Sequence, residues 1–210
     1  MDWMGATIFA FDTEATGLDP TVDEIVQLTI VKYEVGKSWS DMEGYTSLFS
    51  TARPLPAGQA LFCGLTPEDL AGKPTIGECI DSVLDILHLG KVFLSFNAPF
   101  DVGMLQAALK RTGSRRTLPM TMRNTIDPLI FSRGLYPHAR GRKLAQMAAR
   151  LGVRLNRAHD ATSDTLAAAE VMVRMAVQNH LPPDLDALTT LQMKYAEAWS
   201  RMVDRPMDTW

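Results

Sequence analysis

Residues 6–18 of the chain read ATIFAFDTEATGL, an apolar run from Ala6 to Phe11 followed by the acidic pair Asp12 and Glu14. The run predicts a β-strand, and because side chains alternate along a strand, both carboxylates project from one face at its end. Two carboxylates side by side repel each other unless a cation lies between them. The pattern Asp-x-Glu is also a common accident in solvated loops, so the pair alone leaves both interpretations open.

Three more segments have the character of strands. Residues 24–35 alternate between apolar and polar side chains, residues 45–50 can pair beside them, and residues 92–95 form a short apolar run between two helical patterns. The segment over residues 24–35 places three apolar side chains on one face: Val26, Leu28 and Ile30.

Helical patterns lie mainly in the later part of the chain. Residues 53–64 are predicted to be a loop that ends at a helix start, with Thr66 as N-cap and Pro67 in the first helical position. Residues 75–89 carry an apolar stripe and are predicted to stop at Gly90. The other predicted helices cover residues 99–111, 128–133, 143–151 and 161–179. Strands first, helices later and a strand between helices predict an α/β domain around a mixed sheet flanked by helices.

The end of the chain is predicted to be a separate helical extension. Pro182 and Pro183 mark a boundary, which divides the chain into a domain over residues 1–180 and an extension over residues 181–210. The extension carries an apolar stripe at helical spacing: Leu188, Leu191, Tyr195, Trp199 and Met202. Because an isolated helix is marginal in water, we expect this stripe to pack on the rest of the chain, in preference to serving as a partner-binding arm.

Composition narrows the class of protein. The chain has 210 residues, of which 46% are hydrophobic and 21% are charged, with a formal net charge of −3, so it is not a disordered chain. No apolar run approaches the roughly 20 residues of a membrane span, and the first one is too short for a signal peptide. Cys63 and Cys79 have no histidine pair at zinc-ligand spacing. We therefore expect a cytoplasmic, disulfide-free enzyme or binding domain without a membrane partner.

Charge is unevenly distributed along the chain. Residues 1–90 carry four basic and fourteen acidic side chains, whereas residues 110–157 carry twelve basic side chains and one acid. An acidic pole that holds cations and a basic pole that meets phosphates would explain this split. A solvated surface with segregated charges explains it equally well.

Two aspartates fall on helix faces that should point to the core. Asp101 shares a face with Leu105, and Asp164 shares one with Ala168. An ionised carboxylate in such a place is costly unless it is paired or binds a metal. Helix capping or stabilisation of the first turn is the alternative, and it explains Asp101 better than Asp164.

His159 lies five residues before Asp164. A lone loop histidine is usually a surface residue, but this one lies close in sequence to a candidate metal ligand. Four carboxylates can hold two divalent ions about 3.5–4 Å apart, and such pairs of ions drive in-line attack on phosphodiesters. That chemistry also needs a base to deprotonate water, and a histidine suits this role at neutral pH.

Three motifs in this order resemble those of the DEDDh 3′–5′ exonucleases, the superfamily of the proofreading epsilon subunit of bacterial DNA polymerase III and of RNase T. They are FDTEATGL at residues 11–18, NAPFD at 97–101 and HDATSD at 159–164, and the resemblance covers residues 6–178. It implies an RNase H-like fold, two Mg²⁺ or Mn²⁺ ions and release of nucleoside 5′-monophosphates from a 3′ end. It also implies metal-ligand roles for the four carboxylates and a general-base role for His159. The implied metal ligands are Asp12, Glu14, Asp101 and Asp164.

The same resemblance implies where the substrate binds. The loop from Thr13 to Leu18 would hold the terminal nucleotide, with backbone amides near Thr13 facing the 3′-hydroxyl and Leu18 wedged against a base. Phe100 would contact the sugar or base, although Leu18 and Phe100 are also typical core residues. The implied substrate-binding residues are Thr13, Thr16, Gly17, Leu18, Asn97 and Phe100.

Two positions depart from the family pattern. Cys63 begins the tetrapeptide CGLT where relatives often have a histidine, and Phe96 stands where relatives often have a histidine before the asparagine. Both departures leave the metal and base residues intact. Because of these two departures, the substrate class of any one subfamily is not carried over to this chain.

Three functions compete on this basis. The first is a metal-dependent 3′–5′ exonuclease that acts on single-stranded or frayed ends, with DNA favoured and the basic stretch guiding the phosphate backbone. The second is an exoribonuclease like RNase T or oligoribonuclease, and the third is a non-catalytic module that binds nucleic acid beside a polymerase. Nucleic acid 3′ ends are the expected partner. A DNA polymerase or a sliding clamp is a further candidate, the latter from the short clamp-like peptide at residues 178–181.

Overall fold

A five-stranded mixed sheet forms the centre of the protein in the computed structural model, which describes residues 1–155 and 161–203. The strand order is β3-β2-β1-β4-β5. β1, β2 and β3 pair antiparallel, and β4 pairs parallel with both β1 and β5. The strands are β1 (Ile8–Ala15), β2 (Ile25–Tyr33), β3 (Glu43–Leu48), β4 (Val92–Leu94) and β5 (Thr125–Ile126). The predicted α/β class with a mixed sheet is confirmed.

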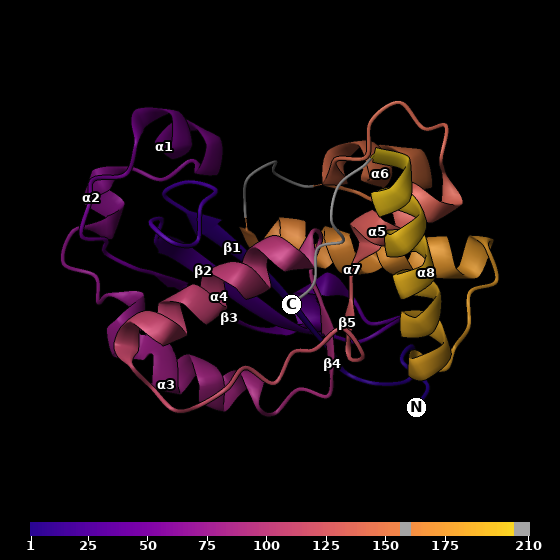
Figure 1. Ribbon diagram of the computed structural model, residues 1–210, viewed down its shortest axis with the longest axis horizontal. Coiled ribbons are helices and arrows are strands. Elements are labelled where there is room, and N and C mark those ends of the chain that lie inside the picture. Colours follow the sequence, from indigo (N-terminus) through magenta and orange to yellow (C-terminus); the bar gives the residue numbers. More distant parts are fainter. Residues whose placement is uncertain (156–160, 204–210) are drawn as a thin grey trace.

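Helices cover both faces of this sheet. Figure 1 shows α3 and α4 side by side across one face, with α5, α6 and α8 gathered at the end of the molecule opposite α1 and α2. The helices are α1 (Ala57–Cys63), α2 (Pro67–Leu70), α3 (Ile76–Leu87), α4 (Ala98–Thr112), α5 (Pro128–Leu135), α6 (Leu144–Leu151), α7 (Ala161–Gln178) and α8 (Leu185–Val203), with one 3₁₀ turn, η1 (Trp39–Asp41).

The alternation of side chains along β1 divides the core into two layers. Ile8 and Ala10 face the cluster that contains the buried sides of α6, α7 and α8. Phe9 and Phe11 face the other cluster, which contains α3 and α4. The strand continues for four residues beyond the predicted apolar run, because pairing with β2 extends through Glu14 to Ala15. Asp12 and Glu14 therefore belong to a strand, and their side chains lie on the α7 side of it.

The stretch predicted to be a loop over residues 53–64 instead contains α1. This seven-residue helix begins after Pro56 and ends at Gly64, which adopts the left-handed conformation of a C-cap. Its residue Cys63 packs with Leu55 in a small cluster against β2. The helix depends on this tertiary packing, because a helix so short has little stability of its own.

Other differences are small. β5 was not predicted, because its two residues are too few to show a pattern. α3 ends at Leu87, before the predicted stop at Gly90. The capping of α2 by Thr66 and the termination of α6 at Gly152 agree with the sequence.

α8 packs on the rest of the protein, mainly against α5. Gly134 makes this possible, because a Cβ there would lie 2.2 Å from the ring of Tyr195. Gln192 is fully buried and hydrogen-bonds the backbone of β5 and of the residue that follows it, at Thr125 O (2.9 Å) and Asp127 N (2.7 Å). The predicted stripe is wrong at its end, since Met202 is 63% exposed.

The N-terminus is held by the same region. Trp3 is fully buried, and its indole Nε1 donates to the carbonyl of Pro182 at 3.1 Å. The N-terminal ammonium group lies 2.8 Å from the carboxylate of Asp184. The described part of the extension is therefore packed on α5 and on the first residues of the chain.

Truncation of the chain at Pro182 is expected to lower thermal stability and solubility. The truncation removes Leu185 and Leu188, and burial of one leucine side chain contributes about 1.5–3 kcal/mol. Thermal melting of the truncated and full chains measures the effect, with Met202→Ala as a control that should melt like the full chain. An unaltered melting temperature after truncation would show that this packing contributes nothing.

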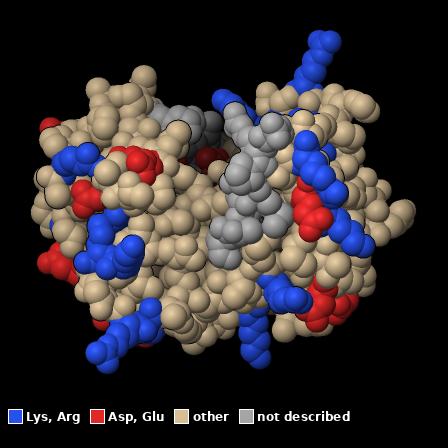
Figure 2. Space-filling view, in the orientation of Figure 1, with Lys and Arg blue, Asp and Glu red and all other residues tan. Residues whose placement is uncertain are grey.

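On the face of the protein drawn in Figure 2, the uneven charge along the sequence is not separated into an acidic pole and a basic pole. Arg116 lies 2.8 Å from Asp85 and 3.4 Å from Asp81 on α3, and Arg111 donates to backbone carbonyls of Pro20 and Asp23. Figure 2 shows basic and acidic side chains interspersed on the outer surface of this face. The topology brings the end of α4 and the segment after it beside acidic segments from the first part of the chain.

Within residues 1–155 and 161–203, no helix has the length and apolar character needed to cross a membrane.

Candidate functional site

The parallel pairing of β1 with β4 brings two acidic segments to one edge of the sheet. Ala10 pairs with Leu94, so the residues that follow Leu94 lie level with the acidic end of β1. α4 begins there and carries Asp101 in its first turn. Asp101 is therefore brought beside Asp12 and Glu14 by the topology.

Asp101 is buried and tightly held. Its Oδ1 atom accepts hydrogen bonds from the backbone N–H (2.8 Å) and hydroxyl (2.6 Å) of Thr13, and its Oδ2 atom accepts one from the hydroxyl of Ser95. Burial raises the pKa of Asp101 to about 6, although the hydrogen bonds from Ser95 and Thr13 act in the opposite direction. Ser95 was not predicted as a site residue. Its position at the end of β4 was the available signal.

Asp12 and Glu14 experience strong repulsion. Burial raises the pKa of Asp12 well above its ordinary range, and the carboxylates of Asp101, Glu14 and Asp164 raise it further. Burial raises the pKa of Glu14 to about 7, with further contributions from Asp101 and Asp164. The four predicted carboxylates therefore lie close enough to affect one another's ionisation. Figure 2 shows acidic atoms recessed in the hollow between the parts of the surface that carry α1 and α5.

The chemistry of this donor set suits a divalent cation. The donors are carboxylate oxygens, which hard ions such as Mg²⁺ and Mn²⁺ prefer, and a cation between them would relieve their repulsion. Within the described ranges, however, no three His, Cys, Asp or Glu side chains already form a metal-binding group. The carboxylate of Asp101 is directed instead to Thr13 and Ser95. The residues fit a metal in type and location, while their side chains are not arranged around a common centre.

The metal-free protein should lose stability as the pH rises. Because the pKa of Glu14 is about 7 in the folded chain against an ordinary value of 4.5, the folded state binds more protons than the unfolded state between these values. The contribution of Glu14 to stability is thus fully present below about pH 4.5 and is lost as the pH rises through 7. Melting temperatures measured with chelator across this range should fall for the natural chain and fall less for Glu14→Gln. A melting temperature that rises steadily over this range in both proteins would contradict the expected repulsion.

His159 lies outside the described residues. The described part of its motif begins at α7, which carries Asp164 in its first turn and packs against β1 and β2. Asp164 lies on the same side of α7 as the buried residues Ala168 and Val171, as the helical spacing predicted.

The predicted nucleotide loop is folded around Asp23. Thr16 is buried and donates its hydroxyl hydrogen to Asp23 Oδ1 at 2.9 Å. Gly17 lies so close to the same carboxylate that a Cβ there would be 2.4 Å from Asp23 Oδ2. Leu18 is 79% exposed, which excludes a core role for it, whereas Phe100, in the first turn of α4, is partly buried and packs on the core.

Asn97 begins α4 in the left-handed conformation, with φ at 79°. Its backbone N–H donates to Asp127, whose buried carboxylate also accepts from the N–H groups of Ala98 and Leu129. Asp127 thus caps α4 and α5 together and sets the entry of the helix that carries Asp101. Its acidity was visible in the sequence as the single acid of a basic stretch, but its partners were not.

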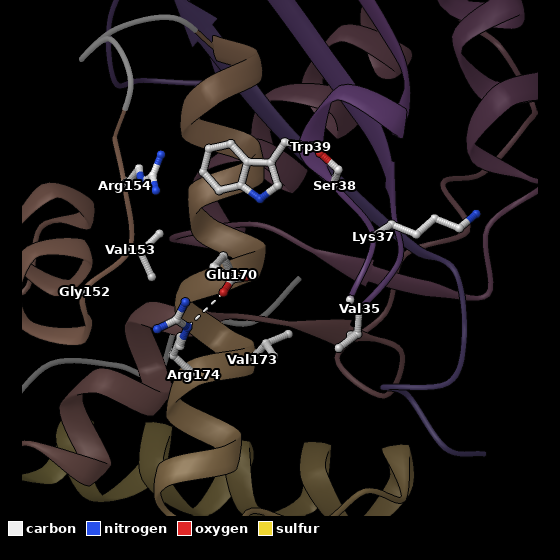
Figure 3. Close-up of a pocket in the computed structure, with 11 residues that line it drawn as sticks. Val35, Lys37, Ser38, Trp39, Gly152, Val153, Arg154, Glu170, Val173 and Arg174 are labelled. Atoms are coloured by element: carbon white, nitrogen blue, oxygen red, sulfur yellow. Dashed lines mark hydrogen bonds and ion pairs between the residues drawn. The ribbon is translucent and has the colours of Figure 1, made fainter.

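A separate pocket of about 700 Å³ lies beside α7 and contains none of the predicted site residues among its described lining. Figure 3 shows the ion pair between Glu170 and Arg174 of α7. Trp39 and Arg154 also line this pocket. Glu170 accepts from Arg174 Nε at 2.9 Å and from the hydroxyl of Tyr33 on β2 at 2.6 Å. The bond from Tyr33 joins α7 to β2 of the sheet and so helps to place the helix that carries Asp164, whereas the bond from Arg174 lies within α7.

Comparison with known proteins gives a consistent result. Residues 9–172 match the RNase_T family model, described as exonuclease. A DNA polymerase III subunit epsilon-like protein of Rhodobacter capsulatus is 32% identical over 172 residues, which are 80% of this chain and 23% of that protein. A PolC-type DNA polymerase III of Streptococcus thermophilus is 27% identical over 188 residues, which are 88% of this chain and 12% of that protein. The chain thus spans less than a quarter of the length of these relatives.

Solved structures share the fold at low sequence identity. Exonuclease X in complex with 5′ overhanging duplex DNA has a TM-score of 0.66 and 18% identity, over 87% of this chain and 99% of that one. A zinc-bound complex of E. coli exonuclease I with single-stranded DNA has a TM-score of 0.65 and 19% identity, over 86% of this chain and 42% of that one. These likenesses agree with the expected RNase H-like arrangement of a mixed sheet flanked by helices.

Proposed function

The chain belongs to the RNase_T family of exonucleases, and from this premise we propose that it is a metal-dependent 3′–5′ exonuclease acting on single-stranded or frayed DNA ends. The observation that carries the proposal is the meeting of Asp12, Glu14, Asp101 and Asp164 at one edge of the sheet, where Asp101 and Asp164 add to the effect of burial in raising the pKa of Asp12 and Glu14. The products would be nucleoside 5′-monophosphates. The DNA polymerase and DNA-complex descriptions of its relatives support DNA over RNA.

The four carboxylates are the proposed ligands of two divalent ions, Mg²⁺ or Mn²⁺. Such ions, when bound, generate a hydroxide nucleophile and stabilise the attacking and leaving oxygens of an in-line displacement. The zinc-bound exonuclease I shows that a structural neighbour accepts a divalent ion. Thr13 and Ser95 hold Asp101 by the hydrogen bonds described above.

His159 is the proposed general base, which would take the proton of the attacking water. Its place before α7 in the sequence, five residues ahead of Asp164, supports this role. The backbone near Thr13, the loop residues Thr16 and Gly17, and Asn97 would position the 3′-terminal nucleotide. Leu18 and Phe100 would contact its base and sugar, and the exposure of Leu18 leaves it accessible for this contact.

A DNA polymerase is the proposed protein partner, since the relatives carry polymerase III names. The clamp-like peptide at residues 178–181 does not support a sliding clamp. Its Leu181 is only 8% exposed and belongs to the core cluster formed with α7 and α8, so it is not presented at the surface.

Degradation of a 5′-labelled oligonucleotide tests the polarity. We expect a descending ladder with Mg²⁺ and no cleavage with chelator, because the site should accept a free 3′-hydroxyl end. Single-stranded DNA, duplex DNA and RNA are compared side by side, and a faster rate on RNA would favour the exoribonuclease function instead. Immediate release of labelled mononucleotide would contradict the proposed direction.

A further inference from the structure

A second pocket, of about 440 Å³, lies where α5, α6 and α8 meet the start of α4. Its described lining includes Phe96 and Asn97 beside α4 and Trp199 of α8. Three basic side chains complete this part of the lining: Arg133, Arg142 and Lys143. No acidic side chain is among the described lining residues. This set is called the basic pocket below.

Trp199 organises the basic pocket. The guanidinium carbon of Arg133 lies 5.0 Å from the centroid of the Trp199 ring, and that of Arg142 lies 5.2 Å from it. Both distances are within the range of cation–π attraction. Arg142 is held further by hydrogen bonds from its Nη2 atom to the carbonyls of Tyr136 (2.9 Å) and Pro137 (2.6 Å). The two planar guanidinium groups are thus restrained before any ligand binds, which suits them to phosphate oxygens.

Asp127 lies beside the basic pocket, as the N-cap residue of α5. Burial raises the pKa of Asp127 to about 6, although backbone hydrogen bonds from the starts of α4 and α5 and the charge of Arg133 act in the opposite direction. Among the described lining residues, three side chains are basic and none is acidic. Such a lining favours an anionic ligand.

The basic pocket lies next to the proposed catalytic edge, which is the edge of the sheet where the four carboxylates meet. Asn97 lines the basic pocket and also begins α4, whose first turn carries Asp101. A strand whose 3′ end lies at the four carboxylates would therefore find the basic pocket adjacent to it. Trp199 lies outside residues 9–172, so the C-terminal helix adds a feature that the family-matched region does not contain.

We propose that the basic pocket binds a backbone phosphate of the substrate strand upstream of its 3′ end, with Arg142, Arg133 and Lys143 as phosphate ligands. Trp199 is a positioning residue that aligns the two guanidinium groups. This assignment rests on the proposed exonuclease function. By this assignment, α8 contributes to substrate binding as well as to packing, because its residue Trp199 completes the surface that binds the strand.

Binding of a fluorescent single-stranded oligothymidylate to the full chain, measured by anisotropy with chelator, tests the assignment. Lys143→Ala and Arg142→Ala are each expected to weaken binding roughly tenfold, as for loss of one charge-assisted hydrogen bond. Each should also reduce the slope of log affinity against log salt by about 0.7, the value for one phosphate contact on a single strand. Arg150→Ala is the matched control, since Arg150 makes a similar contact, 5.6 Å from the Tyr136 ring, outside the described pocket lining. It should bind like the natural chain.

Trp199 is tested by two replacements that both leave a smaller apolar side chain in its place. Trp199→Phe retains an aromatic face and should preserve most of the affinity, whereas Trp199→Leu should weaken it although both variants melt alike. Equal binding by the two variants would show that the ring has no aligning role.

Hydrolysis of a nitrophenyl ester of thymidine monophosphate separates this proposal from the proposed function, because so small a substrate reaches only the catalytic edge. Turnover of this ester should be the same in the natural chain, Lys143→Ala and Arg142→Ala. If the natural chain hydrolyses it but both variants bind the oligothymidylate like Arg150→Ala, the basic pocket assignment is wrong while the exonuclease function stands. If inorganic phosphate displaces the strand at equal phosphate concentration, the pocket takes a free anion and the strand assignment is also overturned. If the natural chain hydrolyses neither ester nor oligonucleotide with Mg²⁺, the exonuclease function itself fails.

Discussion

Asp12→Ala is expected to abolish hydrolysis with Mg²⁺ while the protein stays folded. Asp12 lies on β1 beside Glu14, and its pKa is raised by burial and by all three of the other proposed ligands. Loss of this carboxylate removes one of the proposed metal ligands and also removes repulsion from the metal-free site. We therefore expect the variant to melt at a higher temperature than the natural chain when both are measured with chelator near neutral pH.

Measurement of both properties distinguishes catalytic loss from unfolding. Addition of Mg²⁺ should raise the melting temperature of the natural chain and leave that of Asp12→Ala unchanged, since only ligands that bind the folded state stabilise it. Glu68→Ala, which removes an exposed acid from α2, is the matched control and should retain full activity. Undiminished cleavage by purified Asp12→Ala would end the two-metal hypothesis.

His159→Ala is expected to lower the turnover rate by roughly 10²–10⁴-fold, the usual contribution of a general base. Metal binding should be largely retained, because the proposed ligands are the four carboxylates. The effect should appear in kcat and shrink at high pH, where hydroxide partly replaces the missing base.

His138→Ala is the matched control for this experiment. His138 is exposed and lies before α6, away from the three motifs, so its replacement should leave turnover unchanged. Wild-type turnover by His159→Ala, or a loss that is explained entirely by weaker metal binding, would reassign His159.

The predictable part of the structure is the part governed by local patterns. The buried stripe of α3 and the end of α6 at Gly152 follow from periodicity and capping, which involve residues a few positions apart. The facing of Asp101 and Asp164 toward the core follows in the same way. α1 was missed because its stability comes from contacts with Leu55 and β2 and not from its own seven residues.

The sequence by itself determined the α/β class, the identity of the candidate catalytic residues and the order of their motifs, because strand alternation, helix period and short motifs are local properties of the chain. Tertiary structure alone decided how these residues are held. Ser95 and Thr13 engage Asp101, and Asp127 caps two helices at once, through contacts that no local spacing encodes. The basic pocket has the same origin, since Trp199 meets Arg133 and Arg142 only after α8 packs against α5. Its geometry depends on which buried surfaces fit together, and that is settled by packing across the whole chain.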